Sequence, residues 1–382
     1  MIHEYTGGFI SEGDALTRLQ AFPTASVQCV ITSPPYYGLR NYGTEPFIWD
    51  GDEDCKHIWG NLLPFAKQDN RTLEQKIEQG ASVGNNRKFN DSTTTATSGC
   101  FCQECGAWKG ELGLEPTVQL YIEHLTQIFA EVKRVLKDDG VCFVNLGDSY
   151  NTASGGALDI ALGRRENLSK QAVQTRFTNP VKINQNMPRK SLMQIPSRFG
   201  IRMTDDLGFV LRNNINWLKP ACIPSSAKDR FTIDFEPIFF FTKKPKYKFN
   251  QILEPLAESS KQRIKNSFET NDTKFEKDTP LTAVGNLRNG SNSTSNGLRN
   301  KRTTWSVPFE PSKNNHFAAY PTALVEIMVR CGTDEGDIVL DPFAGTGTTL
   351  YVARCMGRGS VGIELNPEYV KIALERVSNG KL

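Results

Sequence analysis

Residues 337–349 of this 382-residue chain read Asp337-Ile338-Val339-Leu340-Asp341-Pro342-Phe343-Ala344-Gly345-Thr346-Gly347-Thr348-Thr349, and this segment indicates the fold class most directly. Its apolar part predicts a buried strand, its glycines a turn, and the residues after Thr348 a helix. Gly345 and Gly347 permit a tight turn and let a ligand approach the backbone closely. The stretch therefore predicts a strand–turn–helix unit with a ligand at the turn.

An acidic residue follows this unit at an informative distance. The short apolar run Ser360-Val361-Gly362-Ile363-Glu364 ends in a carboxylate nineteen residues after Gly345. A glycine-rich turn followed about 20 residues later by an acid is typical of doubly wound folds that bind an adenosine-bearing cofactor, with the acid on the ribose hydroxyls. The dinucleotide glycine spacing and a Gly-Lys-Ser/Thr phosphate cradle are both missing, which favours a nucleoside over a di- or triphosphate.

A second unusual strand end lies near the start of the chain. Ser33-Pro34-Pro35-Tyr36 follows the apolar run 27–32. The two prolines fix φ and remove two backbone donors, so the strand ends in a rigid corner with a hydroxyl, free carbonyls and an aromatic face. Such a corner suits a planar ring that carries an amino group, although Ser-Pro-Pro also occurs in ordinary turns.

The remaining pattern predicts one α/β domain with a doubly wound, mostly parallel sheet and polar insertions. Helical periodicity stands out at 116–136, followed by a buried strand at 141–146. Further predicted elements are strands at 8–10, 27–31, 209–211, 214–217 and 236–241 and helices at 14–19 and 321–328.

Taken together, these motifs resemble the β-type (permuted) amino-methylating DNA methyltransferases of the N4-cytosine/N6-adenine family. Thr32-Ser33-Pro34-Pro35-Tyr36 resembles their catalytic motif, and 341–347 resembles their cofactor loop. His316-Phe317-Ala318-Ala319-Tyr320-Pro321 resembles the helix-entry motif that precedes this loop. The resemblance implies an S-adenosylmethionine-dependent methyltransferase fold that acts on double-stranded DNA. It implies the catalytic residues Ser33, Pro34, Pro35 and Tyr36 and the cofactor-binding residues Asp341, Phe343, Gly345, Gly347, Glu364, His316, Ala318 and Pro321.

In that family the target base leaves the DNA stack before transfer. An oxygen of Ser33 and the Pro34 carbonyl would hold the amino protons, and Tyr36 would stack on the base. Serine at the first catalytic position is commoner in cytosine-N4 enzymes, so cytosine N4 is the preferred target and adenine N6 the alternative. A non-catalytic DNA-binding protein and an RNA or protein amino methyltransferase are more distant alternatives.

Cysteine and histidine spacing predicts a metal site. Cys55 and His57 are one residue apart, and Cys102 and Cys105 form a Cys-x-x-Cys turn. Two such pairs suit a tetrahedral structural Zn²⁺ that would stabilise the polar insertion between them. Cys100 is an alternative to His57.

Charge and cysteine usage predict the binding partners and the cellular location of the protein. The formal net charge is only +3, but basic residues gather at 164–190 and at 243–248, which fits phosphate contacts. With no signal peptide or membrane-length apolar run, an intracellular (cytoplasmic, prokaryotic or phage-encoded) protein is expected, whose nine cysteines are thiols or ligands. A homodimer and a cognate restriction endonuclease remain open as partners.

The motifs also divide the chain. The catalytic half is expected at 1–54, and the helix and strand that continue it at 111–150. The cofactor-binding half is expected at 303–382 and outer strands at 198–250. The remaining segments are insertions: 55–110 with the zinc site, 151–197 as a basic loop, and 251–302 for target recognition.

Overall fold

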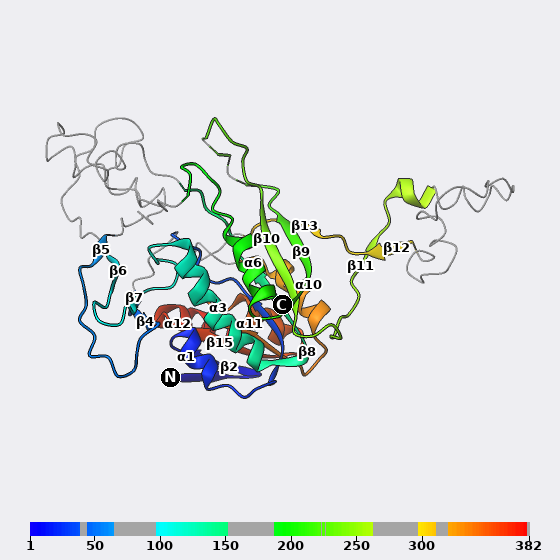
Figure 1. Ribbon diagram of the computed structural model, residues 1–382. Helices are drawn as coiled ribbons and strands as arrows, with labels where there is room; N and C mark the ends of the chain where they lie inside the picture. The colour runs from blue at the N-terminus through cyan, green and yellow to red at the C-terminus, as the bar shows by residue number, and fades with distance from the viewer. Residues whose placement is uncertain are drawn as a thin grey trace, which may run out of the picture.

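The computed structural model describes residues 1–38, 44–64, 97–151, 187–222, 224–225, 227–262, 297–310 and 320–379 (Figure 1). The predicted cofactor residues His316 and Ala318 lie outside these ranges. So does most of the predicted basic loop at 151–197 and of the predicted recognition insertion at 251–302.

A nine-stranded sheet forms the centre of the molecule, in the order β1-β2-β15-β14-β3-β8-β10-β9-β13. Neighbours from β2 to β8 run parallel, whereas β10 is antiparallel to both β8 and β9. The predicted doubly wound, mostly parallel sheet is thus confirmed, and the runs 209–211 and 214–217 contribute to one strand, β9. The strands are β1 (Ile2–Tyr5), β2 (Gly8–Glu12), β3 (Val27–Thr32), β8 (Leu136–Asn145), β9 (Val210–Leu218), β10 (Phe235–Thr242), β13 (Thr304–Ser306), β14 (Ile338–Asp341) and β15 (Gly359–Glu364).

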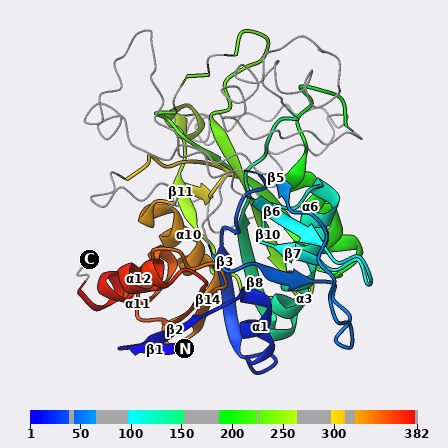
Figure 2. The same ribbon diagram turned by 90° about the vertical axis from the view of Figure 1, so that its left-hand side faces the viewer.

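Helices cover both faces of the sheet (Figure 2). One face carries α1 (Ala15–Gln20), α3 (Val118–Val135) and α6 (Ile195–Asp205); the other carries α10 (Thr322–Gly332), α11 (Thr348–Cys355) and α12 (Pro367–Asn379). Each face buries its own apolar cluster against the strands, with α3 supplying much of the first. Among the helices that the structure describes, none is both long and apolar enough to cross a membrane.

Helix α6 departs from the prediction of outer strands at 198–250. Its buried residues Ile195, Phe199 and Met203 recur every fourth position, which is a helical period. Pro196 stands in the first turn, where a helix tolerates proline because that N–H has no partner in the helix. Phe199 packs edge-on against Phe129 of α3, with ring centroids 5.0 Å apart.

A separate four-stranded antiparallel sheet, in the order β4-β7-β6-β5, lies beside the main domain (Figure 1). It consists of β4 (Phe47–Trp49), β5 (Leu63–Pro64), β6 (Thr97–Phe101) and β7 (Trp108–Gly110). Because β4 pairs with β7, the sheet begins before the predicted boundary at residue 55. A further two-stranded sheet joins β11 (Leu253–Pro255) to β12 (Leu298–Asn300) at the two ends of the predicted recognition insertion.

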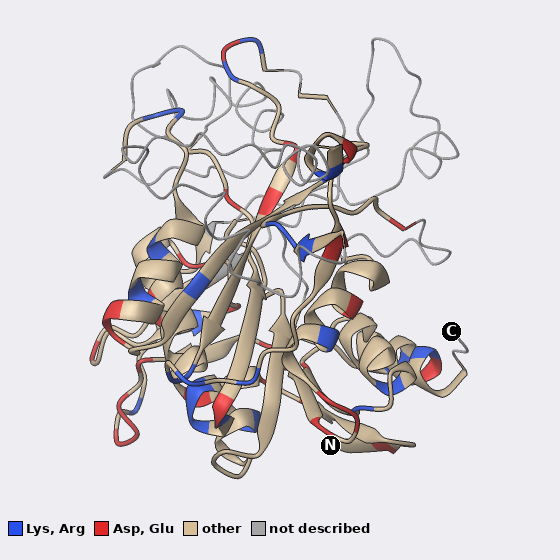
Figure 3. Ribbon diagram, turned by 90° about the vertical axis from the view of Figure 1, so that its right-hand side faces the viewer, with Lys and Arg blue, Asp and Glu red and all other residues tan. Residues whose placement is uncertain are grey.

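The basic run at 243–248 proves to be largely neutralised. Lys244 Nζ lies 2.5 Å from a carboxylate oxygen of Asp138, and Lys248 Nζ lies 2.7 Å from one of Asp337. Both pairs lie at the end of β10 that adjoins the start of β8, opposite the predicted catalytic motif. Over the described ribbon, acidic and basic residues are interspersed (Figure 3). Lys244 and Lys248 of this run thus serve ion pairs within the fold, and the phosphate contacts expected there stay a prediction.

One glycine of the loop before α11 allows a direct test of the fold. Gly347 has φ +76°, and a Cβ there would lie 2.9 Å from Cβ of Ala373 in α12. We expect Gly347→Ala to lower the free energy of unfolding by about 1–3 kcal/mol, measured by urea denaturation. Gly336→Ala is the matched control: its φ is +82° with no atom within 4 Å, so only the backbone cost of about 1 kcal/mol applies. Equal losses in the two variants would contradict the close packing of α11 on α12.

Candidate active site

A pocket opens where β3, β14 and β15 end. Its lining includes Ser33 and Pro35 after β3, Phe343 and Gly345 after β14, and Glu364 at the end of β15. Carboxyl ends of parallel strands meet at one edge of a sheet, which is where doubly wound folds bind ligands. The structure therefore brings the predicted catalytic motif and the predicted cofactor loop into one pocket.

Asp341 joins these two motifs from beneath the pocket. Its side chain is buried, and Oδ1 accepts hydrogen bonds from Thr32 Oγ1 at 2.7 Å and Phe343 N at 3.1 Å. Its Oδ2 accepts from Thr349 Oγ1 at 2.7 Å and from the Tyr320 hydroxyl at 3.0 Å. Burial raises the pKa of Asp341, and these hydrogen bonds oppose the rise. Among the described residues its carboxylate is thus engaged within the protein, and Asp341 is not part of the pocket lining.

Glu364 is the acid that the sequence placed on a ribose. Its carboxylate accepts hydrogen bonds from the backbone N–H groups of Gly345 and Asn366, both at 2.8 Å. Burial raises the pKa of Glu364 to about 7, and those N–H groups act against the rise. Each oxygen keeps a further lone pair for a ligand hydroxyl. The side chain therefore both fixes the glycine loop and faces the pocket.

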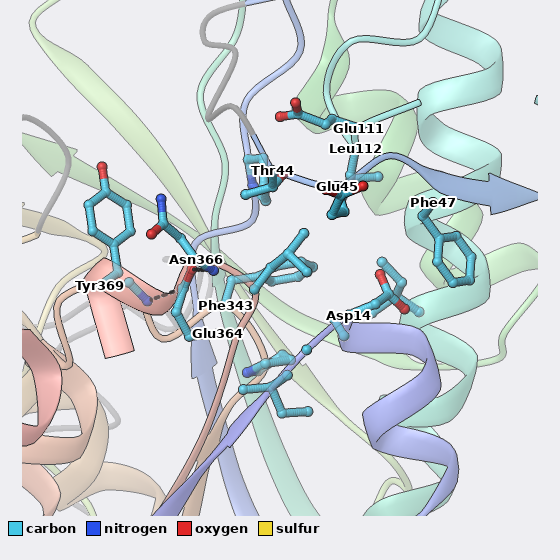
Figure 4. Close-up of a pocket in the computed structure, with 18 of the residues that line it drawn as sticks. Asp14, Thr44, Glu45, Phe47, Glu111, Leu112, Phe343, Glu364, Asn366 and Tyr369 are labelled. Atoms are coloured by element: carbon cyan, nitrogen blue, oxygen red, sulfur yellow. Dashed lines mark hydrogen bonds between the residues drawn. The ribbon is translucent and has the colours of Figure 1, made fainter. Parts of the chain in front are cut away.

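Sequence reasoning missed several residues of the pocket wall. Figure 4 shows Asn366 and Tyr369 on the side of Glu364 and Phe343, with Asp14 and Phe47 across the pocket. Asp14 also caps α1, since its carboxylate accepts from Thr17 N at 3.0 Å. A helix-capping aspartate is detectable in sequence, but its position beside the β15 loop follows only from the pairing of β2 with β15.

Tyr36 turns its hydroxyl toward the antiparallel side of the sheet. That hydroxyl lies 2.9 Å from Glu236 Oε2, 3.0 Å from Asn145 Oδ1 and 3.5 Å from Ser33 Oγ. Its ring lies so close to Gly147 that a Cβ there would fall 2.4 Å from Cε2 of Tyr36. Burial raises the pKa of Tyr36 well above its usual value. The tyrosine is held in place by its neighbours and bounds the site on the side away from the cofactor loop.

The other predicted residues have local roles. Pro34 is buried, and the Pro35 carbonyl accepts a hydrogen bond from the Tyr121 hydroxyl at 2.7 Å. Pro321 stands at the start of α10, directly after the Tyr320 that contacts Asp341. Gly347 begins α11.

The predicted metal ligands converge in the small insertion. One ligand atom from each of Cys55, His57, Cys102 and Cys105 lies within 4.8 Å of all the others. The Cys55 and Cys102 sulfurs are 3.9 Å apart, and Cys105 Sγ lies 3.4 Å from His57 Nδ1. Ligand atoms around a tetrahedral Zn²⁺ with ~2.3 Å bonds are about 3.8 Å apart, so the set has the right dimensions. Cys100, the alternative ligand, is not part of this cluster.

Comparisons with known proteins agree with the geometry. A family model described as DNA methylase, for N6 and N4 methylation, matches residues 27–375. The Type II methyltransferase M.XycI of Xanthomonas campestris pv. cyanopsidis is 32% identical over 97% of this chain and 88% of its own length. The Type II methyltransferase M.Cfr9I of Citrobacter freundii is 31% identical over 98% of this chain and 89% of its own.

A solved structure is similar in fold. The cytosine-N4-specific PvuII DNA methyltransferase superposes with a TM-score of 0.53 at 17% identity, covering 100% of this chain and 89% of that one. With a family model that spans most of the sequence and relatives that align along nearly its whole length, the chain belongs to the N6/N4 family of amino-methylating DNA methyltransferases.

Proposed function

We propose that this enzyme transfers a methyl group from S-adenosylmethionine to the N4 amino group of a cytosine flipped out of duplex DNA. The observation that carries the proposal is Ser33, which lines the same pocket as Gly345 and Glu364. Adenine N6 is the alternative target. Cytosine is preferred because the first residue of the catalytic motif is a serine rather than an aspartate or asparagine.

The pocket residues fit an adenosine-bearing cofactor. Gly345 has φ +52° and its Cβ position has no atom closer than 4.0 Å, so the loop leaves room for a ligand against the backbone. Glu364 offers acceptors for ribose hydroxyls, and the rings of Phe343 and Phe47 offer apolar walls. S-adenosylmethionine bound there would supply an electrophilic methyl group.

Ser33 would act on the target amine. The lone pair of an aromatic amine is delocalised into the ring, which makes it a poor nucleophile. Ser33 Oγ and the Pro34 carbonyl would accept the two amino hydrogens, draw the nitrogen toward tetrahedral geometry and free that lone pair. The prolines hold these acceptors rigidly, so catalysis would rest on positioning and electrostatics.

The central experiment identifies the product. We expect DNA incubated with the protein and methyl-labelled S-adenosylmethionine, then digested to nucleosides, to contain N4-methylcytosine by mass spectrometry. Ser33→Ala should lower kcat by on the order of 100-fold or more while cofactor affinity, measured by calorimetry, stays within a factor of about two. Ser11→Ala, a buried serine in β2, is the matched control and should keep its activity. N6-methyladenine as the product would overturn the choice of base, and absence of labelled DNA would overturn the proposal.

Cofactor binding should depend on pH through Glu364. Its pKa near 7 lies above the ordinary value, so the carboxylate is lost as pH falls below 7. If the ionised form binds the ribose, affinity for S-adenosylmethionine should rise about 10-fold between pH 6 and pH 8, in step with the ionised fraction. Titration calorimetry at several pH values measures this. Glu364→Gln should bind S-adenosylmethionine more weakly at pH 8, and its affinity should not change with pH. An unchanged pH dependence of affinity in that variant would assign the titration to a group other than Glu364.

We further propose that Cys55, His57, Cys102 and Cys105 hold a structural Zn²⁺. Four protein ligands fill a tetrahedral shell and leave no open position for chemistry. The ion would join the segment after β4 to the turn between β6 and β7. It would thereby stabilise a small sheet with few buried side chains of its own.

Metal analysis tests this site. We expect one zinc per purified chain by plasma mass spectrometry, and loss of that zinc in Cys102→Ser. Cys100→Ser is the matched control: Cys100 is equally buried but outside the cluster, so zinc should be retained. Removal of zinc by a strong chelator should lower Tm by several degrees. Zinc that is retained in Cys102→Ser and lost in Cys100→Ser would show that a different set of residues binds the ion.

The relatives' names, Type II methyltransferases, support a cognate restriction endonuclease as a functional partner. DNA methylated by this protein would then resist an endonuclease of the same recognition sequence.

A further inference from the structure

A second polar cluster lies at the same sheet edge as Ser33, on the side away from the cofactor loop. Tyr36 is hydrogen-bonded to Ser33 and to Glu236, and Glu236 in turn forms an ion pair with Lys219. We call Tyr36, Glu236 and Lys219 the edge cluster. Glu236 belongs to β10, and Lys219 directly follows β9. Neither Lys219 nor Glu236 has a role in the chemistry described so far.

The sheet register explains why these residues meet the catalytic motif. Strand β10 begins where β8 ends, with Ile238 opposite Asn145, and Glu236 lies opposite Trp217 of β9. The beginning of β10 and the end of β9 therefore lie at the same edge of the sheet as the end of β3, which Ser33 follows. The Lys219 backbone N–H donates to the Asp234 carbonyl at 2.7 Å, which closes the end of this strand pair. The edge cluster is thus fixed by the main sheet rather than by a mobile loop.

The surroundings of Lys219 are unusual for a lysine. Its side chain is only 14% exposed, and that of Glu236 22%. Its Nζ lies 4.7 Å from the ring centre of Trp217 and 5.0 Å from that of Phe309. An ammonium has three N–H donors, and Glu236 takes one of them. The rings and the carboxylate hold the ammonium in place, and within the described part of the chain Glu236 is the one hydrogen-bond acceptor it contacts, so donors remain for a ligand.

This position matches the chemistry of a flipped pyrimidine. The pairing edge of cytosine carries an amino group, a ring nitrogen and a carbonyl oxygen in a row. Adenine carries an amino group and a ring nitrogen but a C–H in the third place. A hydrogen-bond donor that reaches the third position therefore bonds to the carbonyl oxygen of cytosine and finds no acceptor on adenine. Enzymes that flip bases read them through such contacts on the pairing edge.

We propose that Lys219 is the specificity-determining residue for the target base, donating a hydrogen bond to the O2 carbonyl of the flipped cytosine. Glu236 is a positioning residue that holds the ammonium and the Tyr36 hydroxyl. Phe309, whose ring lies beside the Lys219 ammonium, is half exposed. The inference rests on the proposed function, because it presumes that the amino group of the base lies at Ser33.

The test compares two DNA duplexes that differ in one base. Product mapping with the wild-type protein first gives the recognition sequence. Duplexes with cytosine or adenine at the target position are then assayed with labelled S-adenosylmethionine. Lys219→Met keeps the apolar stem between the two rings and removes the donors. Its kcat/KM on cytosine should fall on the order of 10- to 100-fold, while its low rate on adenine stays unchanged. Lys219→Arg keeps a charged donor and should lose less of the preference.

A matched control comes from the opposite edge of the sheet. Lys244 pairs with Asp138 there, and Lys244→Met should leave the ratio of cytosine to adenine methylation unchanged. Thermal unfolding and cofactor calorimetry confirm that each variant is folded and loaded.

The possible outcomes distinguish failure of the role of Lys219 from failure of the proposed function. A wild-type protein that methylates adenine and not cytosine would overturn both. A wild-type protein that methylates cytosine, with a Lys219→Met variant that loses activity equally on both bases or on neither, would overturn only the role of Lys219. In that case the Lys219–Glu236 pair would be an ordinary ion pair of the sheet edge.

Discussion

The site depends on one buried carboxylate, that of Asp341. A carboxylate removed from water is costly unless hydrogen bonds replace its hydration, so its four donors must be present together. Those donors come from the end of β3, the loop after β14, the first turn of α11 and Tyr320, which precedes the N-cap of α10. Satisfying a single side chain therefore brings the strand end that carries Ser33 against the glycine loop. Asp341, which the sequence predicted as a cofactor-binding residue, fixes the relative positions of both halves of the pocket.

The inserted sheet is part of this construction. Its strand β4 supplies Phe47 and Trp49 to the pocket wall. Trp49 stacks on His124 of α3, with ring centroids 4.3 Å apart, and His124 lies between the carboxylates of Glu115 and Asp50 at 3.0 and 3.2 Å. An imidazole that is hydrogen-bonded to two carboxyl groups and stacked on an aromatic ring attaches the insertion to α3. The insertion is thus an integral part of the pocket wall.

What the sequence predicted correctly is local in origin. The strand at 27–31, the helix within 116–136 and the glycine turn at 345–347 are each encoded by neighbouring residues. The cluster of Cys55, His57, Cys102 and Cys105 was also predictable, because short spacing brings the two members of each pair together. The edge cluster was not, since Lys219 meets Glu236 only through strand pairing, and Glu236 meets Tyr36 across 200 residues. For the same reason the ion pairs of the run at 243–248 were not predictable: its partners Asp138 and Asp337 are distant in sequence and close in space.

The central strand pair also has a consequence for biosynthesis. Strands β3 and β14 are hydrogen-bonded neighbours, and Thr32 and Asp341 meet across 309 residues. At ~5–20 residues per second, a ribosome needs about 15–60 s to make the intervening chain. During that interval the growing protein can pair β3 with β8 on one side only, and its other edge stays open. The permuted order of motifs thus exposes an apolar strand edge in the nascent chain until β14 has been made. Such an open edge favours aggregation or the binding of a chaperone.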